Sequence, residues 1–158
     1  MVAIVIDLES NGLLEDATKI WCICWKELGM GNEVHTVIKP DGTFFIPGNY
    51  ELIGHNIICY DIPLMQKLLY QCKDVNFGDC VDTLVMSRVL NPDRLGGHSL
   101  EAWMERFGGE KKVKQEQWLE FDENMIARCQ SDVLATERVY LELLKEIRTN
   151  GVLPDEHK

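Results

Sequence analysis

The run Val2-Ala3-Ile4-Val5-Ile6-Asp7-Leu8-Glu9, at residues 2–9, organises the whole chain. It begins with five apolar, mostly β-branched residues, which predicts a strand buried on both faces. Because alternate side chains of a strand point to the same face, Asp7 and Glu9 would lie side by side where the strand ends. Two such carboxylates repel each other and lose hydration, and a shared hard cation such as Mg²⁺ or Mn²⁺ offsets both costs. The alternative at this point is a strand that runs out into a polar loop.

Length and composition indicate an ordinary globular chain. It has 158 residues, 46% hydrophobic and 27% charged, which predicts a single domain over residues 1–150 and a flexible C-terminal tail at residues 151–158. No stretch approaches the roughly 18 consecutive apolar residues that cross a bilayer, and the start lacks the basic region of a signal peptide. The six cysteines form no C-x-x-C pair and lie mostly in apolar segments, as small buried hydrophobes do. We therefore expect a cytoplasmic protein without membrane contact.

The charge balance restricts how the chain could bind nucleic acid. A net charge of −10 excludes a module that holds nucleic acid through a broad basic face. It does not exclude an enzyme that acts on nucleic acid, because metal ions neutralise carboxylates and can hold a phosphate. Lys111, Lys112 and Lys114 form a cationic cluster that could approach phosphate, although a solvated loop is the favoured interpretation. Trp118, like the other tryptophans, is predicted to be a core or partly buried anchor rather than a base-stacking platform.

Hydrophobic periodicity predicts an α/β fold, a mixed five-stranded sheet flanked by helices with three antiparallel strands first. Strands are expected at residues 2–9, 19–28, 33–39, 52–56 and 77–81, with a loop at residues 40–49. Helices are expected at residues 61–73, 82–90, 99–107 and 122–148.

Two further acids occupy unusual positions. Asp132 falls on the apolar stripe of the last helix, three residues after Cys129 and four before Thr136. A carboxylate that faces a core needs a cation or many hydrogen bonds, so the alternative is a stripe edge with Asp132 in solvent. Asp61 follows the fourth expected strand and opens a helix, where capping by itself explains a carboxylate.

The order of these acids carries a family resemblance. Asp7-x-Glu9, the segment His55-Asn56-x-x-x-Tyr60-Asp61 and Asp132 resemble the three motifs of the DEDD superfamily of 3′–5′ exonucleases, which have a ribonuclease H-like fold. The stretches I-D-L-E-S-N-G-L-L-E, H-N-I-I-C-Y-D-I-P, V-D-T-L-V-M-S-R-V-L and G-G-H-S-L-E-A-W look like the N-terminal proofreading domain of T-odd phage family A DNA polymerases. The resemblance covers most of residues 2–147. Because the chain stops where a polymerase would continue, we expect a free-standing exonuclease.

The resemblance implies a chemistry and a substrate. Asp7, Glu9, Asp61 and Asp132 would hold two divalent cations, Mg²⁺ or Mn²⁺, about 3.5–4 Å apart. The expected reaction removes nucleoside monophosphates from single-stranded or frayed 3′ ends of DNA. One alternative is an exoribonuclease or oligoribonuclease that acts on RNA. Another is a catalytically weak module that binds nucleic acid or a separate polymerase.

The same resemblance assigns the remaining candidate residues and shows one departure. It places Leu8, Asn11, Leu13 and Asn56 against the terminal nucleotide. Family members carry Tyr four residues, or His five residues, before the last Asp, whereas this chain has Arg128 and Ala127. Arginine cannot act as a base, but Arg128 could pair with Asp132, clamp the scissile phosphate or hydrogen-bond a metal-bound water. We hypothesise that metal ionisation of the water carries the activation, so that Arg128→Tyr preserves or raises activity.

Overall fold

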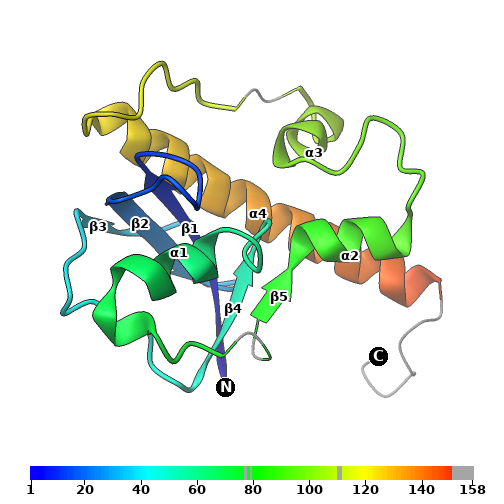
Figure 1. The fold of residues 1–158 in the computed structure, drawn as a ribbon. Coiled ribbons are helices and arrows are strands. Elements are labelled where there is room, and N and C mark those ends of the chain that lie inside the picture. The colour runs from blue at the N-terminus through cyan, green and yellow to red at the C-terminus, as the bar shows by residue number, and fades with distance from the viewer. Residues whose placement is uncertain (77, 79, 110–111, 151–158) are drawn as a thin grey trace.

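The computed structural model describes residues 1–76, 78, 80–109 and 112–150, and the expected tail at residues 151–158 lies outside them (Figure 1). The described strands form one five-stranded sheet of order β3-β2-β1-β4-β5. The first three pair antiparallel, whereas β4 lies parallel to β1 and β5 parallel to β4. The strands are β1 (Val2–Ser10), β2 (Ile20–Glu27), β3 (His35–Ile38), β4 (Tyr50–Gly54) and β5 (Cys80–Asp82). The predicted mixed sheet is confirmed, with β1 at its centre.

Helices cover both faces of this sheet. In Figure 1, α1 lies on one face and the long α4 crosses the other, with α2 and α3 beside α4. The helices are α1 (Asp61–Leu68), α2 (Thr83–Leu90), α3 (Leu100–Arg106) and α4 (Glu123–Thr149), with a 3-10 turn, η1 (Tyr70–Cys72). None of the described helices combines the length and apolar character that crossing a membrane requires.

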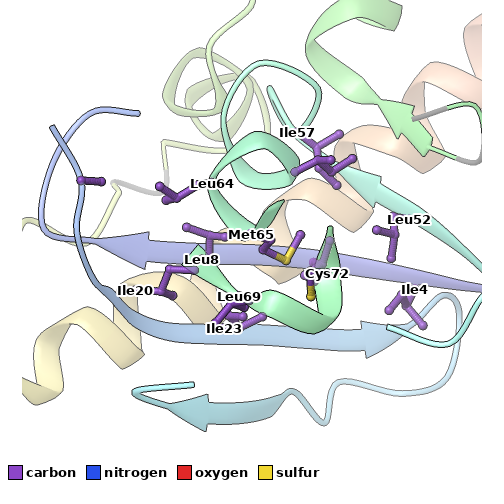
Figure 2. Close-up of a cluster of buried hydrophobic side chains, with 13 residues drawn as sticks. Ile4, Leu8, Ile20, Ile23, Leu52, Ile57, Leu64, Met65, Leu69 and Cys72 are labelled. Carbon is purple, nitrogen blue, oxygen red and sulfur yellow. The ribbon is translucent and has the colours of Figure 1, made fainter. Parts of the chain in front are cut away.

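The alternation along β1 distributes its side chains between two cores. Ile4, Ile6 and Leu8 pack with the α1 side chains in the cluster of Figure 2, where Met65 lies beside Leu8. Val5 packs on the opposite face with Cys129 and other residues of α4. Asp7 and Glu9 continue the face of Val5 because side chains alternate along a strand. Both acids are therefore directed toward α4.

The largest differences between predicted and observed boundaries concern three elements. The helix expected at residues 61–73 ends at Leu68, because Leu69 has an extended backbone with φ −117° and ψ 110°. The strand expected at residues 52–56 ends at Gly54, and Asn56 has a left-handed backbone with φ 61°. The strand expected at residues 77–81 is described only from Cys80 to Asp82, and Phe77 lies outside the described residues. Asp82 both ends that strand and caps α2, as the sequence predicts, by accepting hydrogen bonds from backbone N–H groups at the start of the helix.

Candidate metal centre and nucleotide pocket

Four carboxylates from three elements converge at the end of β1. Asp7 and Glu9 come from β1, Asp61 is the first residue of α1, and Asp132 lies in the middle of α4. Asp132 is 3% exposed, which confirms the core-facing position and excludes the solvent-facing alternative. Asp61 is equally buried, and no side-chain cap was found for α1, so capping does not explain this acid.

Burial and mutual repulsion disfavour ionisation of these acids. Burial raises the pKa of Asp7 well above its usual value, and the charges of Asp132, Asp61 and Glu9 raise it further. Burial also raises the pKa of Glu9 to about 7, although the Arg128 guanidinium opposes this shift. The pKa values of Asp61 and Asp132 are likewise raised, chiefly by burial. Four ionised carboxylates at this point would need positive charge to offset their repulsion.

The hydrogen bonding of the acids fits a hard cation. Asp7 Oδ2, Asp61 Oδ1 and Asp132 Oδ1 are buried, and no hydrogen-bond partner was found for them among the described residues. Asp82 provides the contrast, because its equally buried oxygens accept backbone N–H groups of Asn56, Ile58, Leu84 and Val85. Unpaired buried carboxylate oxygens cost free energy, and they are the ligands that Mg²⁺ and Mn²⁺ prefer.

A buried thiol lies beside the carboxylates without competing for such a cation. Cys129 Sγ is within 4.8 Å of ligand oxygens of both Asp7 and Glu9. Its thiol donates a hydrogen bond to the backbone carbonyl of Asp7 at 3.3 Å, so it links α4 to β1. Thiols are poor ligands for hard cations, which leaves the carboxylate oxygens as the donor set. Cys22, Cys24 and Cys72 are also buried, as predicted, whereas Cys59 is exposed.

Two side-chain cations contact the acids. Arg128 Nε lies 3.3 Å from Glu9 Oε1, so the ion pair of Arg128 is with Glu9 and not with Asp132 as one alternative had it. Lys112 Nζ lies 3.2 Å from Asp132 Oδ2, and the prediction of a solvated loop is therefore wrong for Lys112. Lys114 is exposed, and Lys111 lies outside the described residues.

A pocket of about 320 Å³ opens next to Glu9. Leu13, Tyr60 and Trp118 line it with apolar and aromatic side chains. Ser10 and Gly12 complete the lining. The Tyr60 hydroxyl fixes one wall by hydrogen bonds to Ser10 Oγ at 2.5 Å and to the Gly12 carbonyl at 2.8 Å. Trp118 is half-buried as predicted, and its carbonyl accepts the indole N–H of Trp21 at 2.8 Å. Its place in this pocket was not predicted, because residues 107–122 show no periodicity.

The candidate substrate residues have different surroundings. Leu13 is 75% exposed and lines the pocket. The Leu8 side chain is buried in the core against α1, so contact of Leu8 with a nucleotide, which stays a prediction, would be made by its backbone. Asn11 closes its own loop by hydrogen bonds to Thr18 and Lys19. Asn56 is half-buried beside Asp82.

The five-stranded mixed sheet and the four converging carboxylates are the arrangement for which the sequence motifs predict a DEDD-type 3′–5′ exonuclease. No family model matches it. It is 27% identical over 187 residues to the DNA-directed DNA polymerase of Escherichia phage T7 and 28% identical over 188 residues to that of Enterobacteria phage T3. Each alignment covers 90% of the chain but 27% of the polymerase, so the chain spans about a quarter of these relatives.

Solved structures confirm the predicted ribonuclease H-like fold. NrnC of Brucella melitensis matches with a TM-score of 0.69 at 16% identity, over 94% of this chain and 75% of NrnC. RNase D of Escherichia coli, an exoribonuclease involved in structured RNA processing, matches with a TM-score of 0.66 at 15% identity, over 96% of this chain and 41% of RNase D. The resemblance to DEDD exonucleases, first drawn from the motifs, is thus confirmed by sequence similarity and fold.

Proposed function

We propose that this chain is a metal-dependent 3′–5′ exonuclease that hydrolyses the terminal phosphodiester bond of DNA and releases nucleoside monophosphates. The observation that carries the proposal is the convergence of three buried carboxylate oxygens from β1, α1 and α4, for which the described residues offer no hydrogen-bond partner. Asp7, Glu9, Asp61 and Asp132 would hold two divalent cations, which when bound supply an activated water and stabilise the leaving 3′ oxygen. Mg²⁺ bound to the neighbour NrnC supports a cation of this kind.

Arg128 keeps Glu9 available as a ligand. Burial raises the Glu9 pKa, and the positive charge of Arg128 partly offsets that shift and leaves the pKa at about 7, so a larger fraction of Glu9 is ionised near neutral pH than without Arg128. Arg128 is itself always protonated and cannot accept a proton from water. The activation of water therefore falls to the bound cations rather than to a base on α4.

The pocket beside Glu9 suits the terminal nucleotide. Leu13, Tyr60 and Trp118 offer apolar and aromatic surface, on which any base can stack without sequence preference. The unpaired end of a strand can enter such a pocket, whereas a base held in a duplex cannot. We therefore favour single-stranded or frayed 3′ ends as the substrate.

The sugar preference separates two enzyme functions. DNA is favoured because both curated relatives are DNA-directed DNA polymerases. The second candidate, an exoribonuclease or oligoribonuclease, is supported by the names of the structural neighbours, one an exoribonuclease and one solved with pGG. We also propose a separate polymerase as a partner, and the similarity to the phage enzymes supports this. A catalytically weak module is disfavoured, because unpaired buried carboxylates destabilise a fold that does not use them.

The test is a time course with 5′-labelled single-stranded DNA and the equivalent RNA, in Mg²⁺, Mn²⁺ or EDTA. We expect a ladder that shortens from the 3′ end, requires the metal and is lost in Asp7→Ala. If the RNA is shortened faster than the DNA, the second candidate function, an exoribonuclease or oligoribonuclease, is the correct one. No shortening of either strand in any metal would refute the enzyme and favour the binding module.

A further inference from the structure

Lys112 shares a carboxylate with the proposed metal centre. Its Nζ contacts Asp132 Oδ2 at 3.2 Å, and the Asp132 side chain is 5% exposed whereas that of Lys112 is 26% exposed. The other oxygen, Asp132 Oδ1, is buried and has no hydrogen-bond partner among the described residues, and the charge of Asp132 acts on Asp7. Asp132 is therefore directed toward the metal centre by one oxygen and toward the surface by the other.

The two positively charged side chains that contact the acids, Arg128 and Lys112, differ in how many contacts hold them. The Arg128 guanidinium contacts Glu9, donates to the Val113 carbonyl at 2.7 Å and lies over the ring of Trp118 at 5.3 Å. Within the described part of the chain, the ion pair with Asp132 is the one polar contact found for Lys112 Nζ. An ammonium carries three donors on a flexible stem, so Lys112 retains the capacity to bind a second anion.

Lys112 also lies on a surface that a nucleic-acid strand could contact on its way to the carboxylates. Together with Lys114, Gln115 and Arg128 it lines a groove of about 630 Å³ between the start of α3 and the segment before α4. Glu101, Glu105 and Glu116 line the same groove and would repel a phosphate backbone. The Lys112 ammonium, which lines the groove and contacts Asp132, offsets that repulsion beside the carboxylates.

We propose that Lys112 is a substrate-binding residue, whose ammonium transfers from Asp132 to a non-bridging oxygen of the scissile phosphate when Asp132 ligates a divalent cation. A cation on Asp132 withdraws its lone pairs and repels the ammonium, while the incoming phosphate attracts it. Lys112 thus competes with the metal in the free protein and assists the substrate afterwards. The inference rests on the proposed exonuclease function.

The first experiment measures Mn²⁺ binding by calorimetry at pH 8.0 without nucleic acid. Lys112→Gln should bind Mn²⁺ about fivefold more tightly than the unaltered protein, because the competing ion pair is lost. Lys114→Gln removes the same charge from an exposed neighbour and should stay within about twofold. Equal effects of the two variants would reduce Lys112 to one charge among several and overturn the proposal.

The second experiment measures the affinity for a labelled single strand with a 3′-terminal phosphorothioate linkage, at saturating Mn²⁺, by fluorescence anisotropy. Lys112→Gln should weaken binding about tenfold and Lys112→Arg should restore most of it, whereas Lys145→Gln, at an exposed lysine of α4 that does not line the groove, should change it little. A structural role would not combine tighter metal binding with weaker strand binding, so an unchanged strand affinity in Lys112→Gln overturns the proposal.

The two proposals fail in distinguishable ways. If the unaltered protein binds no Mn²⁺, the exonuclease function itself is refuted. If it binds Mn²⁺ and shortens DNA while Lys112→Gln behaves as the control variant of each experiment, only the role of Lys112 is refuted.

Discussion

Arg128 Nε lies 3.3 Å from Glu9 Oε1, so the residue that replaces the usual Tyr or His of the last motif forms an ion pair with the acid at the end of β1. The charge of Arg128 lowers the pKa of Glu9 against the effect of burial. We therefore expect Arg128→Gln to move the acid limb of the pH profile of cleavage, at fixed subsaturating Mn²⁺, upward by about one pH unit. Arg138→Gln is the control, because Arg138 is an exposed arginine of α4 that contacts Phe107. If the acid limb of the pH profile stays at the same pH in Arg128→Gln, the ionisation of Glu9 does not control it.

The activation hypothesis makes a separate prediction for Arg128→Tyr. If the bound cations ionise the water, replacing a group that cannot be a base by a tyrosine should leave kcat unchanged or raise it. The comparison belongs at pH 8.5, because the Glu9 pKa of about 7 already includes the effect of Arg128, and Glu9 remains mostly ionised at this pH even if its pKa rises by about one unit in the variant. Loss of turnover at that pH, with the fold intact by circular dichroism, would reveal an essential role of Arg128.

Two buried acids with different hydrogen bonding should respond oppositely to amide substitution. Asp61 is 3% exposed with an unpartnered Oδ1, and Asp82 is 4% exposed with both oxygens bonded to backbone N–H groups. Asp61→Asn should lower cleavage by roughly 100-fold or more and leave the melting temperature unchanged or higher. Asp82→Asn should lower the free energy of unfolding by about 1–3 kcal/mol, because the amide NH₂ faces a donor. Destabilisation by Asp61→Asn would mean that this carboxylate supports the fold.

The raised pKa of Glu9 predicts a pH-dependent stability difference. The folded protein holds the Glu9 proton up to a pKa of about 7, against the ordinary 4.5, so ionisation destabilises the metal-free fold progressively between these pH values. In EDTA, Glu9→Gln should therefore gain stability over the unaltered protein as pH rises from 4.5 to 7, by up to about 3 kcal/mol. His55, whose pKa burial lowers to about 4, affects both proteins equally and cancels.

Urea unfolding at pH 5, 6, 7 and 8 measures this difference. Saturating Mn²⁺ at pH 8 should reverse it, because the unaltered protein binds the cation more tightly than Glu9→Gln does. A difference that does not vary with pH would show that Glu9 is ionised without cost.

Leu13 tests the nucleotide pocket without disturbing the fold. Its side chain is 75% exposed, so Leu13→Ala should leave the melting temperature unchanged. Loss of apolar contact with the terminal nucleotide should raise KM about three- to tenfold with little change in kcat. Leu95→Ala is the control, because Leu95 is 92% exposed and does not line the pocket. Equal KM values for the two variants would show that the terminal nucleotide does not bind in this pocket.

Several local features of the sequence were sufficient to predict parts of the structure. The alternation of β1 and the 3.6-residue stripe of α4 are periodic over many residues, so the strand, the helix and the buried position of Asp132 could be predicted. Element ends were predicted less well, because a single extended residue, Leu69, stops α1 without a proline or glycine to mark it.

The sequence by itself determined the mixed sheet, the order of the four acids and the resemblance that they carry, because these depend on neighbours along the chain. Only the tertiary structure decided that Lys112 contacts Asp132, that Arg128 pairs with Glu9 and that Trp118 closes a pocket beside Glu9. Those contacts join residues 20 to more than 100 positions apart, and the segment before α4 that supplies Lys112 and Trp118 has no repeating pattern. The position of such a segment depends on how the packed sheet and helices bring distant residues together, which no local period encodes.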